Sequence, residues 1–567
     1  MNELLVRLRQ KPLLASELLA ATFFINLLGF ASPVFVMLIL GVYINAGFDG
    51  TLITLSIGML IAMLIKLAFQ QVRMLQANEL GSGRDRRLSD SVFEVLSRAR
   101  TSVLERMPGA RRLEAAGHAQ AVQNAYGAMN VTAVLDAPFS LFFLAATWWL
   151  SPALALVGLI GIGLSLAAGF FSMKFSREHA GNLQNLSAAN RGLLSSAMYG
   201  ADTVRVFRGK EFLGRAWEQQ TRKMSGLRKT LARLNGRSIS LTLANMTFIR
   251  VVIYAVGAKE CVMGELSFAA LIVANILVSR ALRQVTGLLS AMLQFSRAKT
   301  ALAELEEFFK LPLEPESGTA MRAYSGALEL KDLGFGYPGG TGPLFESLTL
   351  SLRPGNVLVA HGYNGAGKTT LARMTAGLIE PLRGEILADG VNLRQMAPGW
   401  WRGQIIYMPQ EPTFLNGTIR ENITMANPDV SPEALGRIIS ACRLTRFLDN
   451  LEHGLDTQIT DAGRNLPLGF RRRLALARAL ATNGALAILD EPTEGLDADG
   501  ARAVYAVIRE MAAAGKTVIA FSHDVNILRG ANFTLNLSVK PTPKITAAPT
   551  QGSPGGDMKD AGKSRIQ

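Results

Sequence analysis

Cysteine is scarce in this chain of 567 residues, which contains only Cys261 and Cys442. The two lie far apart in apolar or helical contexts, so neither a disulfide framework nor a cysteine-based zinc site is expected. Acidic residues are also few, since 44 aspartates and glutamates face 59 lysines and arginines and leave a net charge of +15. Such an excess of positive charge suggests nucleic-acid binding, unless its distribution along the chain has another cause.

Long apolar runs are abundant, and they fall in roughly the first half of the chain. A cleaved signal peptide is not expected, because the first run is too long and lacks a small-residue cleavage site. The runs pair into three hairpins with tight connections, and the longest can cross the ~30 Å of hydrocarbon in a bilayer. We therefore predict a membrane domain over residues 1–311 with long cytoplasmic helical extensions and six spans, at about 18–43, 52–69, 133–150, 153–173, 239–256 and 268–293.

The basic residues gather in the two long connections, around 70–130 and 174–237, whereas the tight connections hold only Lys259. By the positive-inside rule, the long connections and both termini are predicted to be cytoplasmic. The topology of the membrane domain thus explains much of the excess of basic residues. We therefore expect a lipid bilayer as partner and no nucleic acid. Lys66 and Asp136 are the nearest candidates for intramembrane charges, and we interpret them as interfacial rather than as part of a substrate path.

The pattern changes after the last span. Residues 312–326 contain prolines and a glycine and predict a linker. Residues 327–540 alternate short strands, turns and helices, which is typical of an α/β domain. Residues 541–567 are rich in Pro, Gly, Thr and Lys and predict a disordered tail.

The α/β domain contains a phosphate-binding loop. The segment fits G-x-x-x-x-G-K-[ST] and stands between an apolar strand and a helix, as the motif requires. Backbone N–H groups of such a loop surround phosphates, and the start of the helix adds its positive end. Lys368 would reach the β- and γ-phosphates, and the Thr369 hydroxyl would hold Mg²⁺. The loop consists of Gly362, Tyr363, Asn364, Gly365, Ala366, Gly367, Lys368, Thr369 and Thr370.

Five further side chains predict the rest of an ATP site. An apolar strand ends in Asp490 and Glu491, which suit a magnesium ligand and a group that polarises the attacking water. His523 ends another apolar strand and is predicted to contact the γ-phosphate. Gln410 follows a strand and could coordinate Mg²⁺ or the water. Tyr337 offers an aromatic face for adenine, although it could equally pack in a turn.

Together these motifs resemble the ATP-binding cassette (ABC) family over nearly the whole chain. Six spans followed by a cassette are similar to an exporter half-transporter, fused from an α-helical membrane domain and an α/β P-loop nucleotide-binding domain. The resemblance implies Gln410 as the lid-loop residue, Asp490 as the metal ligand, Glu491 as the catalytic base and His523 as the switch histidine. It also implies coupling helices near 111–117 and 200–211.

Within this family, the membrane half resembles the type I secretion branch. The weaker matches that suggest this are 31–37, 200–205 and 279–282. A peptidase-like domain before the first span, which some secretion exporters have, is not expected. The branch implies an exported protein or peptide, a periplasmic adaptor, an outer-membrane channel and a place in the bacterial inner membrane.

The chain departs from the family at the signature motif, Leu-Ser-Gly-Gly-Gln. The aligned residues are Leu466-Pro467-Leu468-Gly469-Phe470. In a closed dimer the signature caps the ATP of the opposite cassette, and Pro467 offers neither a hydroxyl nor an N–H. Arg464 also stands where an acidic residue is usual. A heterodimer with a second half-transporter is therefore preferred to a weakly active homodimer.

The sequence thus predicts an ATP-driven exporter half whose ATPase activity alone is in question. A lipid or small-amphiphile exporter would have the same six spans. A non-transporting membrane subunit, in which the cassette acts as a nucleotide switch, is favoured by the altered signature but disfavoured by Glu491 and His523.

Overall fold

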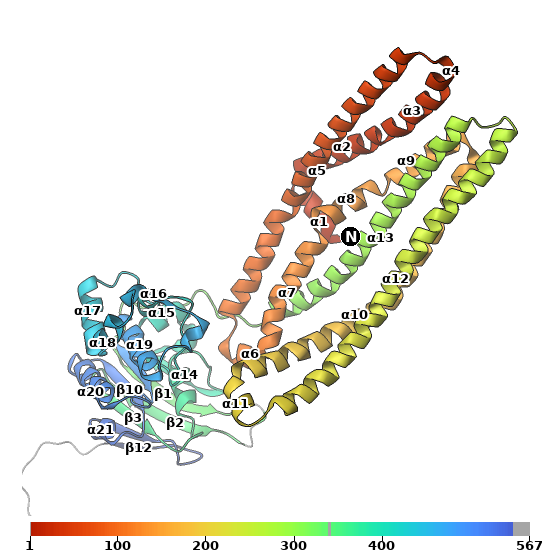
Figure 1. The fold of residues 1–567 in the computed structure, drawn as a ribbon. Helices are drawn as coiled ribbons and strands as arrows, with labels where there is room; N and C mark the ends of the chain where they lie inside the picture. Colours follow the sequence, from red (N-terminus) through yellow and green to blue (C-terminus); the bar gives the residue numbers. More distant parts are fainter. Residues whose placement is uncertain (1, 338, 340–341, 548–567) are drawn as a thin grey trace, which may run out of the picture. The chain divides into compact units, whose positions relative to one another are not determined.

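The computed structural model describes residues 2–337, 339 and 342–547 of the chain. It forms two compact units: the first consists of residues up to Pro312 except Arg100–Ser102, and the second consists of Arg100–Ser102 and the chain from Leu313 onward. The first unit is entirely helical, and the second combines strands with helices (Figure 1).

The first unit is built from helices that are mostly far longer than a membrane is thick. Helix α5, for example, has 50 residues and is about 75 Å long at ~1.5 Å per residue. The main helices are α1 (Asn2–Gln10), α2 (Pro12–Leu27), α3 (Ala31–Leu38), α5 (Asp49–Arg98), α7 (Gly109–Ala125), α8 (Ala128–Asp136), α9 (Phe139–Leu150), α10 (Pro152–Tyr199), α12 (Lys210–Val262) and α13 (Phe268–Phe309). The short helices are α4 (Ile44–Ala46), α6 (Thr101–Arg106) and α11 (Ala201–Val206).

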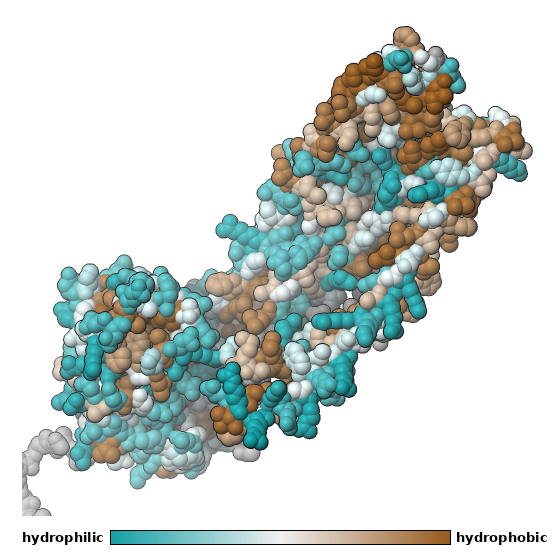
Figure 2. Space-filling view, in the orientation of Figure 1, coloured by the Kyte–Doolittle hydropathy of each residue, from teal (hydrophilic) through white to brown (hydrophobic). Residues whose placement is uncertain are grey.

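Six helical segments of the described chain are long and apolar enough to cross a membrane. Each contains one of the apolar runs of the sequence and extends beyond it. Large apolar side chains are exposed on them, including Leu60 and Leu64, which are 57% and 58% exposed. Figure 2 shows such side chains gathered over the ends of α2, α3 and α5. The segments are Pro12–Tyr43, Asp49–Arg98, Arg111–Leu150, Pro152–Phe175, Lys210–Val262 and Phe268–Phe309.

Two spans begin at a serine that caps the helix. The Ser151 hydroxyl accepts from the Leu154 N–H at 3.2 Å, and Pro152 occupies the first turn, where its missing N–H costs nothing. Ser267 accepts from the Ala270 N–H at 3.1 Å at the start of α13. The first span is less regular, because a 3₁₀ turn (Leu28–Phe30) and a π turn (Ile39–Tyr43) interrupt it. The sequence indicated a break at Pro33, which follows the 3₁₀ turn, but it did not indicate the π turn.

Helix α13 supplies the largest buried face of this unit. It packs against α7, α8, α9, α10 and α12, and α10 and α12 run side by side (Figure 1). Ala274, Ala281, Ala291 and Ala298 on α13 are fully buried. Small residues of this kind let membrane helices approach closely.

The second unit is organised around a six-stranded, mainly parallel sheet with strand order β12-β11-β3-β10-β9-β6. A four-stranded antiparallel sheet, β2-β1-β4-β5, and the pair β7-β8 complete it. The strands are β1 (Leu328–Phe335), β2 (Phe345–Leu352), β3 (Val357–His361), β4 (Arg383–Ala388), β5 (Val391–Asn392), β6 (Ile405–Met408), β7 (Gly417–Thr418), β8 (Gln458–Ile459), β9 (Leu486–Asp490), β10 (Thr517–Phe521), β11 (Phe533–Asn536) and β12 (Lys544–Ala547). The helices are α14 (Lys368–Thr375), α15 (Pro398–Gly403), α16 (Ile419–Thr424), α17 (Pro432–Ala441), α18 (Thr445–Asp449), α19 (Leu468–Ala481), α20 (Ala498–Ala513) and α21 (Val525–Arg529).

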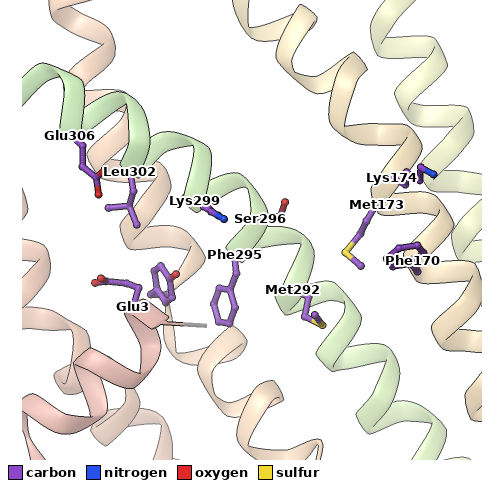
Figure 3. A pocket seen from close by; sticks show the side chains of 11 residues that line it. Glu3, Phe170, Met173, Lys174, Met292, Phe295, Ser296, Lys299, Leu302 and Glu306 are labelled. Atoms are coloured by element: carbon purple, nitrogen blue, oxygen red, sulfur yellow. The ribbon is translucent and has the colours of Figure 1, made fainter.

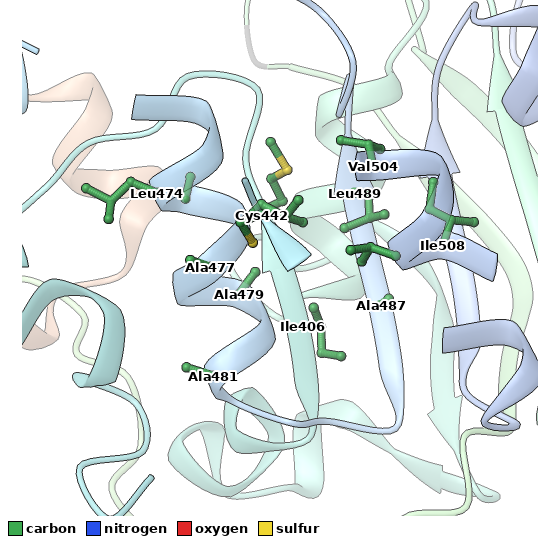
Figure 4. Close-up of a cluster of buried hydrophobic side chains, with 14 of the residues drawn as sticks. Ile406, Cys442, Leu474, Ala477, Ala479, Ala481, Ala487, Leu489, Val504 and Ile508 are labelled. Carbon is green, nitrogen blue, oxygen red and sulfur yellow. The ribbon is translucent and has the colours of Figure 1, made fainter. Parts of the chain in front are cut away.

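Strands β3, β9 and β10 lie inside this sheet and are almost wholly buried, as expected for parallel strands covered on both faces. On one face, Ile406 and Leu489 pack with α19, α20 and the buried thiol of Cys442 (Figure 4). Burial raises the pKa of the Cys442 thiol, so this cysteine is an inert core residue.

The predicted tail is wrong in its first part. The Pro541 carbonyl accepts from the Glu346 N–H at 2.7 Å, and β12 pairs antiparallel with β11. Composition indicated disorder, but the alternation Lys544-Ile545-Thr546-Ala547 suits an edge strand that an existing sheet can pair. Residues 548–567 of the predicted tail lie outside the described residues.

Part of the predicted linker belongs to the second unit. Tyr324 is 7% exposed and meets Trp401 edge to face at 5.2 Å. Thr319 forms a parallel bridge with Met396. The α/β fold therefore includes residues N-terminal to the predicted start at 327.

Candidate nucleotide-binding site

The phosphate-binding loop joins β3 to α14. Strand β3 lies between β10 and β11, so the loop leaves the middle of the sheet at the carboxyl ends of its strands. Gly367 is the last residue before α14 begins, and its φ of 106° requires glycine. Asn364 and Gly365 are exposed, whereas Gly362, Ala366 and Thr370 are buried.

Lys368 brings three motifs of the sequence together. Its side chain is 9% exposed, and its ammonium group donates to the Gly362 carbonyl at 2.9 Å. The same nitrogen lies 3.1 Å from Glu491 Oε1 and 2.6 Å from His523 Nε2. Glu491 and His523 are themselves 3.9 Å apart. A γ-phosphate bound by Lys368 would therefore have a carboxylate and an imidazole beside it.

The sheet explains this meeting of residues distant in the sequence. Strands β9 and β10 are parallel neighbours, with Asp490 opposite Phe521. The Glu491 N–H donates to the Phe521 carbonyl at 2.8 Å, so the residues that follow both strands emerge together. Glu491 adopts a φ of 45°, which is rare for a residue with a side chain and is often found at functional sites.

Asp490 has the chemistry of a metal ligand. It is fully buried, and neither carboxylate oxygen has a hydrogen-bond partner among the described residues. The pKa of Asp490 is raised to about 6, chiefly by burial and less by the charge of Glu491, while Thr369 and Lys368 partly offset the rise. The Thr369 hydroxyl donates to Gln410 Oε1 at 3.3 Å. A carboxylate, a hydroxyl and an amide oxygen are ligands that suit Mg²⁺, which keeps several waters.

Glu494 and Arg472 were not predicted, and they hold Gln410 in place. Gln410 Nε2 donates to Glu494 Oε2 at 3.3 Å, which leaves Oε1 directed at Thr369. Arg472 is 5% exposed, lies 3.2 Å from Glu494 and donates to the Glu491 carbonyl at 3.0 Å. The only sequence signal for Glu494 was an acid close after Asp490 and Glu491 at the end of a strand.

Tyr337 stands at the outer side of the loop. Its hydroxyl lies 3.0 Å from Thr370 Oγ1, and its ring meets Phe335 edge to face at 5.0 Å. The side chain is 50% exposed and lines a cavity of about 430 Å³ that also includes Pro343 and Leu382. The ring is therefore accessible to a planar ligand as well as packed.

His361, the last residue of β3, is a second unpredicted neighbour of the loop. Burial, and then the charges of His523 and Lys368, lower the pKa of His361 below its ordinary value. Its ring is neutral at pH 7, so it adds no positive charge to the site.

Comparison with known families identifies both units. Residues 17–285 match the ABC transporter transmembrane region, and residues 345–494 match the ABC transporter family model. The chain belongs to the ABC transporters. It is an ABC exporter half-transporter with an ATP-binding cassette, a multi-pass membrane protein and a transport ATPase. The predicted fold class is confirmed.

This ABC exporter is similar to several secretion proteins. The alpha-hemolysin translocation ATP-binding protein HlyB of Escherichia coli O157:H7 is 27% identical over 91% of the chain and 73% of its own length. The exotoxin translocation ATP-binding protein PaxB of Pasteurella aerogenes and the leukotoxin translocation ATP-binding protein LktB of Bibersteinia trehalosi are each 25% identical over the same shares. The resemblance to type I secretion exporters is thus supported.

A solved structure shares the fold. The structure of a bacterial Atm1-family ABC exporter with ATP bound has a TM-score of 0.80, covers 94% of both chains and is 17% identical in sequence. This likeness concerns the fold alone.

The ABC signature of this chain differs in shape as well as in sequence. Pro467 precedes α19 with extended backbone, at the place where a serine would offer its hydroxyl. Leu468 is 46% exposed at the first helical position. Phe470 is 3% exposed and stacks on Phe447 at 5.4 Å, so it is a core residue. The start of α19 presents an apolar surface in place of a hydroxyl group.

Proposed function

We propose that this chain is one half of a heterodimeric ABC exporter in which it binds ATP competently but caps its partner's ATP poorly. The observation that supports this is the contrast inside one cassette. Lys368, Glu491 and His523 meet within hydrogen-bonding or ionic distance. At the start of α19, by contrast, Pro467 offers neither a hydroxyl nor an N–H, and Leu468 adds an exposed apolar side chain.

In the proposed reaction, the Gly362–Thr370 loop and Lys368 bind the ATP phosphates, and Tyr337 stacks on adenine. Thr369, Gln410 and Asp490 would hold Mg²⁺, which neutralises phosphate charge when bound. Glu491 accepts a proton from the water that attacks the γ-phosphorus, and ADP and phosphate are the products. Lys368 binds the γ-phosphate and His523 orients it. Both roles follow from the position of the Lys368 ammonium and the His523 ring next to each other and beside Glu491.

We further propose that the exported substrate is a protein or peptide. Relatives named for the translocation of hemolysin, exotoxin and leukotoxin support this assignment. The proposal includes a bacterial inner-membrane location with cytoplasmic termini and cassette, a periplasmic adaptor and an outer-membrane channel. A lipid or small-amphiphile exporter is the second candidate, since the same fold could serve it.

The test is the ATPase activity of the purified chain in lipid, alone and co-purified with a second half-transporter encoded beside it. We expect activity only with the partner, because the partner's signature would complete this chain's site. Comparable activity of the chain alone would contradict the heterodimer and support a homodimer.

A further inference from the structure

The polar residues of four membrane spans form one cluster. Asp136, at the end of α8, accepts from Arg73 of α5 at 2.7 Å and from Asn26 of α2 at 2.8 Å. Asn26 Oδ1 in turn accepts from Gln284 of α13 at 2.6 Å. The sequence suggested an interfacial position for Asp136, but these bonds place it within a network that joins α2, α5, α8 and α13.

The cluster contains more positive than negative charge. Arg280 of α13 donates to the Gly29 carbonyl and lies over the Phe143 ring at 5.5 Å, with no acid as partner among the described residues. Lys66 of α5 lies within electrostatic range of Asp136, Arg73 and Arg280, and within the described ranges it makes no hydrogen bond or ion pair. Asp136 thus pairs with Arg73 and lies within electrostatic range of Lys66, while Arg280 is a further cation near Lys66.

Arg280 lies at a depth where charge is costly, and Lys66 lies nearer the far side of its span. Lys66 is 17 residues from the start of α5, and Arg280 is 12 residues from the start of α13. At ~1.5 Å per residue Arg280 is about 18 Å from the tight-turn end, well inside the ~30 Å of hydrocarbon, whereas Lys66 is about 26 Å from it, close to the opposite interface. Ionisable residues at such depth usually mark a substrate or ion pathway.

A cavity follows along the same helix, towards its C-terminal end. It has a volume of about 730 Å³ and is lined by Lys174 and Met173 of α10 and by Phe295 and Lys299 of α13 (Figure 3). Neither lysine has an ion pair in the part of the chain that the structure describes. The acids of the lining are Glu3, which pairs with Arg7 and Arg84, and Glu306.

We propose that this cationic path, defined by Lys66, Arg280, Lys174 and Lys299, binds acidic side chains of an extended polypeptide substrate. The inference rests on the proposed export of a protein or peptide. Arg280 and Lys299 are 19 residues apart on α13, or about 28 Å, a distance that an extended segment of about nine residues covers. A small amphiphile would not reach both. Carboxylates would neutralise the unpaired cations, and methionine and phenylalanine side chains adapt to varied apolar neighbours.

Peptide binding tests the proposal without ATP hydrolysis. The full chain in phosphatidylcholine nanodiscs, without nucleotide, is titrated into a fluorescent peptide of about nine residues with alternating glutamates, and into its glutamine counterpart. We expect the glutamate peptide to bind about tenfold more tightly, and Lys66→Met and Lys299→Met each to weaken it about fivefold. Asp136→Asn, which keeps the side-chain shape and removes the acid, should strengthen it. Lys259→Met, the same change at an exposed tight turn, should have no effect.

Two outcomes would overturn the proposal. Equal affinity for the two peptides, or unchanged affinity in both Lys66→Met and Lys299→Met, would show that the cations do not bind acidic side chains. If Lys66→Met instead leaves peptide affinity unchanged but loses co-purified phosphatidylglycerol, the cluster binds a lipid headgroup. Since no nucleotide is present, either failure leaves the ATPase test of the exporter pair unaffected.

Discussion

Glu494 illustrates how a residue outside the recognised motifs controls one inside them. It accepts from the Gln410 amide nitrogen and is held by the buried Arg472 of α19. The amide oxygen of Gln410 is thereby turned towards Thr369. Glu494 is thus a positioning residue for the predicted magnesium site.

Glu494→Ala should therefore raise the Mg²⁺ concentration needed for tight ATP binding. The Gln410 amide would be free to rotate, and loss of a residue that orients a metal ligand should cost about tenfold in metal affinity, the low end of the usual effect because the Gln410–Glu494 bond is long at 3.3 Å. The measurement is fluorescent ATP-analogue binding against Mg²⁺ concentration. Glu452→Ala, at an exposed position elsewhere in the cassette, is the matched control, and an equal shift in both variants would contradict the role of Glu494.

Asp490 links the site to pH. Its folded-state pKa of about 6 lies above the ordinary value of 3.8, so the folded cassette binds a proton more tightly than the unfolded chain. The corresponding stability is fully present below about pH 3.8 and is lost progressively as pH rises from there through about 6. At neutral pH the buried carboxylate destabilises the nucleotide-free cassette, by at most about 3 kcal/mol for a shift of this size.

Asp490→Asn should consequently raise the melting temperature without nucleotide at pH 7.5 and raise it by about half as much at pH 5, which lies between the two pKa values. The same variant should lose Mg²⁺-dependent ATP binding. Thermal denaturation of the full chain at both pH values checks the first expectation. A melting temperature that falls at pH 7.5 would show that the carboxylate is satisfied in the folded state.

The site residues that could be predicted from the sequence are those whose role is indicated by neighbouring residues in the same short segment. Lys368 and Thr369 follow a strand and a glycine-rich loop, and Asp490 and Glu491 end an apolar strand. Glu494, Arg472 and His361 escaped prediction because their contacts depend on how α19 and the strands pack, which no short segment encodes.

At the scale of elements, α19 separates two effects of the altered signature. Pro467 and Leu468 lie at its start, where the signature would face the ATP of a partner cassette. Phe470 belongs to the core and stacks on Phe447. Restoring the whole family signature would thus have two opposite effects. It would improve the cap through Pro467 and Leu468 but lower the stability of the cassette through the loss of Phe470.

Pro467→Ser combined with Leu468→Gly should raise the ATPase activity of the chain purified alone. The serine supplies a hydroxyl, and the glycine lets the backbone at the start of α19 approach the phosphate closely. Phe470→Gln should destabilise the cassette by about 3 kcal/mol or more, as loss of a buried aromatic ring does. Activity and melting temperature of each variant separate the two. Unchanged activity in the double variant would mean that the cap does not limit turnover.

The elements show where pattern and composition succeed and fail. The apolar runs predicted the spans because hydrocarbon demands length and low polarity. The strand β12 was missed because Lys544–Ala547 has the composition of a tail, and only pairing with β11 makes it a strand. Of the two interruptions of the first span, the 3₁₀ turn has a sequence signal in Pro33, which has no N–H for the Gly29 carbonyl one turn earlier, whereas the π turn left no clear signal.

At the scale of the whole molecule, the proposed function makes the chain one side of an asymmetric pair. A partner's signature would complete the site around Lys368, while the start of α19 would serve the partner's site poorly. The sequence could indicate this asymmetry but not the partner, because a half-transporter encodes only its own half of each composite site.

ATP trapping by Glu491→Gln tests this asymmetry most directly. The substitution removes the base and keeps the side chain's shape, so ATP should remain enclosed once a cap closes over it. We expect retained radiolabelled ATP after desalting only when the variant is co-purified with the second half-transporter, and none when Lys368→Ala is added. Equal retention by the variant purified alone would contradict the heterodimer, since Pro467 and Leu468 would then be an adequate cap.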